Sequence, residues 1–162
     1  MKNIYDKIQT LDGLAKIAAE LKRKGKKIAH CHGVFDLIHP GHIRHLSSAK
    51  KEGDVLLVTI TADKFVRKGP GRPVFNENLR AETLAALSDV DYVAINNAPT
   101  AVNCIKLLKP DLYVKGPDYQ DAAKDVTGKI KDEEKAVASA GGKLFITDDI
   151  TFSSSKLINE HL

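Results

Sequence analysis

The sequence predicts an α/β protein: a Rossmann-like, doubly wound parallel sheet of five strands in a three-layer α/β/α arrangement. One observation is that short apolar runs alternate with longer segments of helical periodicity, which favours a parallel sheet covered on both faces. Another is the β-branched run at residues 55–61, Val-Leu-Leu-Val-Thr-Ile-Thr, which is typical of a central parallel strand. The third is that polar, glycine-rich stretches follow the apolar runs, where ligands bind in such sheets.

The first elements are a leading helix, a strand and a second helix. Residues 11–24 place apolar side chains on one helical face, and Gly25 ends the helix. Residues 26–32 form a short apolar run of the buried-strand type, and residues 41–52 return to helical spacing. We therefore expect a crossover helix directly after the first strand.

The rest of the chain repeats this pattern around one long loop. Residues 64–75 are polar and contain two glycines and two prolines between charged side chains, so we expect a loop there. Periodicity and the glycine and proline boundaries give the remaining elements: helix 77–87, strand 92–95, helix 100–108, strand 112–115, helix 132–140, strand 143–147 and helix 153–161.

Composition predicts a soluble, cytoplasmic protein with one domain, 1–162, in which a leading helix (1–25) precedes a Rossmann-like core (26–162). The chain is 43% hydrophobic and 28% charged, and no apolar run approaches the ~18 residues of a membrane span. Two cysteines do not make a disulfide framework. The net charge of +4 comes from dispersed lysines, which favours anionic metabolites over nucleic acid or a membrane as partners.

The stretch 31–42, Cys-His-Gly-Val-Phe-Asp-Leu-Ile-His-Pro-Gly-His, marks the expected site. It lies where the first strand passes into a helix, and a helix N-terminus presents free N–H groups and a positive dipole end to a phosphate. Glycines 33 and 41 allow a ligand to approach the backbone. His39 and His42 can each donate a hydrogen bond to a phosphoryl oxygen. The stretch therefore predicts a site that stabilises charge on a phosphate.

These residues resemble a known family. Gly33-Val34-Phe35-Asp36 and His39-Pro40-Gly41-His42 are similar to the GxFD…HxGH motif of the nucleotidyltransferase superfamily, which includes the cytidylyltransferases. Further runs resemble its sugar-phosphate branch, typified by heptose-1-phosphate adenylyltransferase, the nucleotidyltransferase half of a bifunctional heptose kinase/adenylyltransferase. These runs are residues 69–74, 80–87, 90–93, 109–119 and 152–158.

Two departures bear on the substrate. Pro117 replaces the second glycine of the branch's KGGDY run, so the backbone near the nucleobase is expected to differ. The glycerol-3-phosphate cytidylyltransferases carry an arginine shortly before the final serine/threonine turn, and residues 147–150 here are Thr-Asp-Asp-Ile. The second departure favours the sugar-phosphate branch.

The resemblance implies that a phosphate oxygen of an acceptor attacks the α-phosphorus of a nucleoside triphosphate and displaces pyrophosphate. Because the acceptor phosphate is already ionised, positioning and charge stabilisation suffice. The expected catalytic residues are His39, His42, Lys68 and Arg72. The expected nucleotide contacts are Gly33, Val34, Phe35, Gly41, Lys115, Gly116, Asp118, Tyr119, Ser153, Ser154 and Ser155. Asp36 and Arg80 are expected to bind the acceptor, with helix-start stabilisation and a surface position as their respective alternatives.

Several alternatives stay open at this point. The favoured substrates are ATP and a sugar phosphate such as heptose-1-phosphate. The alternative substrates are CTP and glycerol-3-phosphate or another small phosphorylated alcohol. The alternative of another class is a catalytically silent nucleotide-binding module. We expect no protein metal site, because strand alternation separates His30 and His32 from Cys31, so Mg²⁺ would arrive with the triphosphate. The resemblance also leaves open a homodimer and a sugar kinase that is fused to the chain or works beside it.

Overall fold

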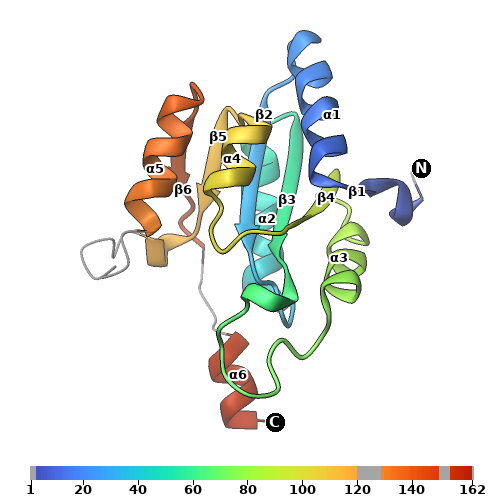
Figure 1. Ribbon diagram of the computed structural model, residues 1–162, viewed down its shortest axis with the longest axis vertical. Helices are drawn as coiled ribbons and strands as arrows, with labels where there is room; N and C mark the ends of the chain where they lie inside the picture. Colours follow the sequence, from blue (N-terminus) through green and yellow to red (C-terminus); the bar gives the residue numbers. More distant parts are fainter. Residues whose placement is uncertain (1–2, 120–128, 150–153, 162) are drawn as a thin grey trace.

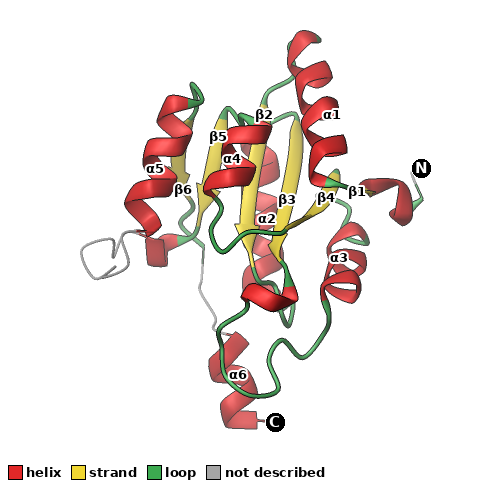
Figure 2. Cartoon of the chain, in the orientation of Figure 1, coloured by secondary structure: helices red, strands yellow, loops and turns green. Residues whose placement is uncertain are grey.

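The computed structural model describes residues 3–119, 129–149 and 154–161. One six-stranded sheet, with every neighbouring pair parallel and the order β1-β4-β3-β2-β5-β6, lies between two layers of helices (Figures 1 and 2). The strands are β1 (Ile8–Gln9), β2 (Ile28–Gly33), β3 (Val55–Thr61), β4 (Tyr92–Asn96), β5 (Leu112–Lys115) and β6 (Lys143–Ile146). The helices are η1 (Ile4–Lys7), α1 (Leu11–Arg23), α2 (Pro40–Glu52), η2 (Asp63–Phe65), α3 (Glu77–Ala85), α4 (Val102–Leu108), α5 (Lys129–Ser139) and α6 (Ser154–His161).

The predicted fold class is confirmed, and the predicted count of five strands is wrong by one. The additional strand is β1, which pairs with β4 through Ile8 opposite Val93 and Gln9 opposite Ala94. A strand of two residues is too short for an alternating pattern, so only its pairing identifies it. The segment before α1 therefore extends the sheet at its edge.

Two apolar cores lie on the two faces of the sheet. On one face, Leu14 and Ala18 of α1 pack in a cluster with α4 and α5 side chains such as Ile105 and Val137. On the other face, α2 and α3 contribute a second cluster that includes Leu46 and Leu84. All seven residues of β3 are buried, because helices cover the centre of a parallel sheet on both sides.

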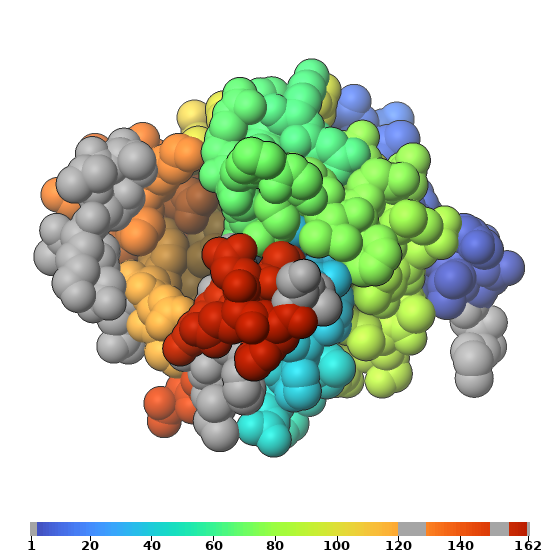
Figure 3. Space-filling view, turned by 90° about the horizontal axis from the view of Figure 1, so that it is seen from below, coloured from blue at the N-terminus to red at the C-terminus, as the bar shows by residue number. Residues whose placement is uncertain are grey.

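The order of the strands positions the site. The chain runs from β2 outwards to β3 and β4, and then returns to the other side of β2 with β5. At such a switch point the connections leave β2 and β5 in opposite directions, which opens a crevice at their carboxyl ends. Beyond the pair His30–Tyr113, the Lys115 ammonium donates to the His32 carbonyl at 3.2 Å. Seen from this end, α6 lies next to the loop that follows β3 (Figure 3).

In the part of the chain that the structure describes, no helix has both the length and the apolar character needed to cross a membrane.

Candidate functional site

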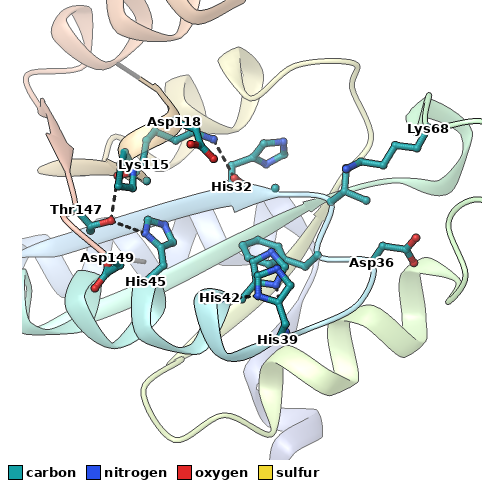
Figure 4. Close-up of a pocket in the computed structure, with 16 residues that line it drawn as sticks. His32, Asp36, His39, His42, His45, Lys68, Lys115, Asp118, Thr147 and Asp149 are labelled. Carbon is teal, nitrogen blue, oxygen red and sulfur yellow. Dashed lines mark hydrogen bonds between the residues drawn. The ribbon is translucent and has the colours of Figure 1, made fainter. Parts of the chain in front are cut away.

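A cavity of about 330 Å³ opens at the switch point, between the turn after β2, the turn after β5 and the end of β6 (Figure 4). Eleven of the expected site residues line it: Gly33, Val34, Phe35, Asp36, His39, Gly41, His42, Lys68, Lys115, Gly116 and Asp118. Pro117, expected near the nucleobase, also lines the cavity. So do four residues that were not named as site residues: His32, His45, Thr147 and Asp149.

The turn after β2 holds a tightly built pair of histidines. The Nδ1 atom of His39 accepts from the His42 backbone N–H at 3.3 Å, and Nδ1 of His42 accepts from the His39 N–H at 3.4 Å. The two rings stack with centroids 3.8 Å apart, and the Phe35 ring meets His42 edge-on at 5.3 Å. Because both Nδ1 atoms act as acceptors, each neutral ring carries its proton on Nε2 and is a donor there.

The backbone around this pair is specialised. Phe35 adopts a left-handed conformation with φ 51°, which is uncommon for a residue other than glycine and occurs often at functional sites. A Cβ at position 33 would lie 3.1 Å from the Phe35 ring, a tight contact that the ring could accommodate only by moving a few tenths of an ångström. The GVFD turn is thus shaped by close packing between its own residues.

The histidines of the site favour the neutral form. Burial lowers the pKa of His42 to about 4, with the neighbouring His39, His45 and Lys68 acting in the same direction. Burial and the positive charge of Lys115 lower the pKa of His45 to about 4, and Asp149 opposes that shift. Burial also lowers the pKa of His39. At neutral pH these rings are therefore uncharged donors.

Two histidines of the site escaped prediction. His45 lies one turn after His42 on α2, and its Nδ1 is 2.9 Å from the hydroxyl of Thr147. His32, near the end of β2, is hydrogen-bonded to β3: its Nδ1 lies 2.8 Å from the Thr59 hydroxyl. The i, i+3 spacing of His42 and His45 places both on one face of the helix and could have indicated His45. The contact with Thr147 could not be predicted, because it joins residues about a hundred positions apart.

Lys115 is the cation at the end of β5. Its ammonium donates to the His32 carbonyl and points along the cavity wall (Figure 4). Gly116, Pro117 and Asp118 continue the wall, as expected for the turn after a parallel strand. Tyr119 does not line the cavity: its side chain is buried and its hydroxyl donates to the Ile130 carbonyl at 3.1 Å.

Asp36 holds the loop that follows β3. Its Oδ1 accepts from the Val74 and Phe75 N–H groups at 2.7 and 3.2 Å, and its Oδ2 accepts from Nε of Arg72 at 2.7 Å. Both side chains of this ion pair are almost fully buried. The Asp36 carboxylate, expected on the acceptor, is thus occupied by the loop. The Arg72 side chain, expected to be catalytic, is buried in this ion pair and is not among the residues that line the cavity.

Lys68 reaches the cavity from the same loop. Its pKa is lowered by burial and by the positive charge of Arg72, and Asp36 opposes this shift. Segment 72–75 of the loop is hydrogen-bonded to Asp36, and Lys68, which precedes it, lines the cavity (Figure 4).

Arg80, expected to bind the acceptor or to lie on the surface, is instead 1% exposed and does not line the cavity. Its guanidinium donates to the carbonyls of Val34 at 2.7 Å, Thr61 at 2.9 Å and Phe75 at 3.0 Å, and its Nη2 pairs with Asp63 at 2.6 Å. All its nitrogens are thus engaged by protein groups. In this position it fastens the turn after β2 to both ends of the long loop.

The serine turn is only partly described. Ser153 lies outside the described residues, and Ser154 and Ser155 begin α6 with side chains that are not described. Among the described residues, no group of three histidine, cysteine or carboxylate side chains could hold a metal ion.

Comparison with known proteins places the chain in a family. A model of cytidylyltransferase-like domains matches residues 30–160. "Bifunctional protein HldE" of Aliarcobacter butzleri is 44% identical over 144 residues, which cover 87% of this chain and 30% of that protein. The protein of the same name from Geobacter metallireducens is 44% identical over 140 residues, which cover 85% of this chain and 27% of its own length. The chain thus spans about a third or less of these curated relatives.

Solved structures agree with this assignment. The lipopolysaccharide core biosynthesis protein of Thermoplasma volcanium superposes with a TM-score of 0.61 at 26% identity, covering 80% of this chain and 100% of that one. A pantoate-β-alanine ligase from Francisella tularensis has a TM-score of 0.66 at 18% identity over 94% of this chain and 72% of its own, and it supports the fold alone. The match over residues 30–160 includes the histidine pair and the turn after β5, and it confirms the resemblance seen in the sequence: the chain belongs to the cytidylyltransferase-like family of nucleotidyltransferases.

Proposed function

We propose that the chain transfers a nucleotidyl group from a nucleoside triphosphate, with ATP favoured, to a sugar phosphate such as heptose-1-phosphate, and releases pyrophosphate. One observation carries the proposal: the stacked histidine pair, Lys68 and Lys115 surround a single cavity at the switch point of the sheet. Neutral N–H donors and ammonium groups around one space are what a reacting triphosphate requires.

In this proposal each group stabilises charge that develops on phosphate oxygens. The Nε2–H groups of His39 and His42 donate to the oxygens of the α-phosphate and the departing pyrophosphate, and the N-terminus of α2 adds its dipole. Lys68 and Lys115 supply positive charge from opposite sides. The acceptor phosphate needs no base, so the chain contributes position and electrostatics, and Mg²⁺ enters with the triphosphate as part of the substrate.

The choice of substrates rests on the relatives. The HldE proteins carry "bifunctional" in their names and are between three and four times the length of the matched part. This supports a second activity in those proteins, for which we propose a sugar kinase that supplies the acceptor, either fused or separate. CTP with a small phosphorylated alcohol is the alternative pair, because the family as a whole is described as cytidylyltransferase-like.

A matrix of the four nucleoside triphosphates against heptose-1-phosphate, other sugar-1-phosphates and glycerol-3-phosphate tests the proposal, with pyrophosphate release as the readout. ATP with a sugar-1-phosphate should give the fastest release, and each triphosphate alone should give none. Fastest release with CTP and glycerol-3-phosphate would establish the alternative. Tight triphosphate binding without release for any pair would indicate a silent binding module.

A further inference from the structure

A buried carboxylate lies behind the cavity and is not part of its lining. Glu133 of α5 is 8% exposed, and its Oε2 accepts from the Tyr113 hydroxyl at 3.1 Å and the Tyr119 hydroxyl at 3.3 Å. Buried carboxylates need hydrogen-bond partners, and the two tyrosine hydroxyls supply them. The Tyr113 pKa lies well above its ordinary value, first because of burial and then because of the Glu133 charge, so this phenol stays a donor.

The two tyrosines that Glu133 holds are the two rings that flank Lys115. The Lys115 ammonium lies 5.6 Å from the Tyr113 ring centroid and 5.5 Å from that of Tyr119. A cation at this distance is attracted to an aromatic face. A lysine side chain is otherwise flexible, with several rotatable bonds and a large rotamer entropy. The rings therefore restrict Lys115 to the position from which it lines the cavity.

The connection between α5 and this cation is direct. Tyr113 belongs to β5 and Tyr119 ends the turn that follows it, so Glu133 ties both sides of the Lys115 turn to one helix. The Tyr119 hydroxyl has one proton, which is shared between Glu133 and the Ile130 carbonyl on the same helix. Loss of the carboxylate leaves the Tyr113 hydroxyl buried with its acceptor removed, which forces that ring or the turn to shift.

We infer that Glu133 is a positioning residue for triphosphate binding: through Tyr113 and Tyr119 it fixes the Lys115 ammonium against the cavity. This inference rests on the proposed function, in which Lys115 contacts the phosphates. It concerns affinity for the triphosphate and not the chemical step, because Glu133 does not line the cavity and is joined to Lys115 through the two rings.

A double-mutant cycle with Lys115 tests the inference, with binding of a non-hydrolysable ATP analogue as the readout. Glu133→Leu should raise the Kd about tenfold in the wild-type background and leave it unchanged in Lys115→Met, since the contact that Glu133 supports is then already absent. Glu133→Gln, whose amide oxygen still accepts from Tyr113, should stay within about threefold of the wild type. Glu134→Leu, on the exposed side of the same helix, is the matched control and should not change the Kd.

The result that overturns the inference is an equal loss from Glu133→Leu with and without Lys115, because a general loosening of the fold would act in both backgrounds. An unchanged Kd in the wild-type background overturns it as well. If Glu133→Leu does not fold, Tyr119→Phe replaces it in the same double-mutant cycle, and the Kd is expected to rise about threefold.

A ligand-free readout separates this inference from the proposed function. The rate at which an amine-reactive acylating reagent modifies Lys115, followed by mass spectrometry, should rise several-fold in Glu133→Leu and not in Glu134→Leu. If the wild-type chain bound no triphosphate analogue, the proposed function would fail, while unchanged Lys115 reactivity in Glu133→Leu would refute the role of Glu133 by itself.

Discussion

At the residue scale, the histidine pair has two tasks that can be separated. His39 is the N-cap of α2 through Nδ1, while its Nε2 is the donor proposed for the phosphates. The HxGH spacing follows from this geometry, because the residue at the N-cap and the residue three positions later are the ones that can cap each other reciprocally. Both rings then lie side by side at the cavity.

Replacing His39 by asparagine should remove catalysis and leave the cap. Asparagine is a good N-cap residue, so the free energy of unfolding should change little, whereas kcat should fall about 10²–10³-fold with the loss of one preorganised donor. His39→Ala should lose the same activity and also about 1 kcal/mol of stability. Steady-state kinetics and urea unfolding on both variants check this. Near-normal kcat in His39→Asn would exclude the proposed role of Nε2.

The lowered histidine pKa values also predict acid sensitivity of the fold. His30, His42 and His45 have pKa values of about 3, 4 and 4 in the folded state because of burial, against the ordinary histidine value of 6.5. Between about pH 6.5 and 4 the unfolded chain therefore binds more protons than the folded chain. Stability should be fully present above pH 6.5 and fall as the pH decreases through this window.

His45→Gln isolates one of these protons. Glutamine keeps a polar group near Thr147 and does not titrate, so the decrease in unfolding free energy from about pH 7 to about pH 5 should be smaller by about 2 kcal/mol than in the wild type. Urea titrations at the two pH values measure the difference. An identical decrease in both proteins would mean that His45 is not held neutral in the fold.

At the scale of elements, the long loop after β3 is fixed to the turn after β2 by two buried side chains. Asp36 reaches from the turn to the loop backbone, and Arg80 reaches from α3 back to the turn. These contacts put Lys68 at the cavity. Composition predicted a polar loop and could not reveal its attachments, because most of them are made to backbone N–H and carbonyl groups that carry no residue identity.

Arg80→Leu should therefore destabilise the fold and not only weaken a substrate contact. It removes three hydrogen bonds to buried or partly buried carbonyls, for an expected loss of about 2–4 kcal/mol in unfolding free energy. Arg44→Leu, at an exposed position on α2, is the control and should change stability by less than about 0.5 kcal/mol. Wild-type stability in Arg80→Leu, measured by urea unfolding, would contradict the role of this arginine as a fastening.

Long elements could be predicted from the sequence, whereas a very short strand and contacts between distant segments could not. The six longer helices and five strands produced clear periodic patterns, and residues 55–61 match β3 over its whole length. The pair Ile8–Gln9 is a strand only because β4 lies beside it. For the site, the motif around His39 lies within one turn and was visible, whereas Thr147 and Glu133 reach it through contacts between distant segments.

At the scale of the whole molecule, the strand order brings the separate motifs to one place. The turn after β2, the loop after β3, the turn after β5 and the end of β6 all border the crevice that the reversal between β2 and β5 creates. The two lysines of the cavity come from the loop after β3 and from the end of β5, so strands on both sides of β2 are required to assemble it. We therefore propose that nucleotidyl transfer occurs in this cavity.

Transfer of a label from ATP tests whether the reaction takes place there. With ATP labelled at the α-phosphorus, heptose-1-phosphate and Mg²⁺, the wild-type chain should move the label into a nucleotide-sugar and release unlabelled pyrophosphate, and His39→Asn should reduce this transfer about 10²–10³-fold while remaining folded. Label that stayed in ATP, with no acceptor in the matrix able to move it, would contradict the account. So would transfer at the wild-type rate by His39→Asn.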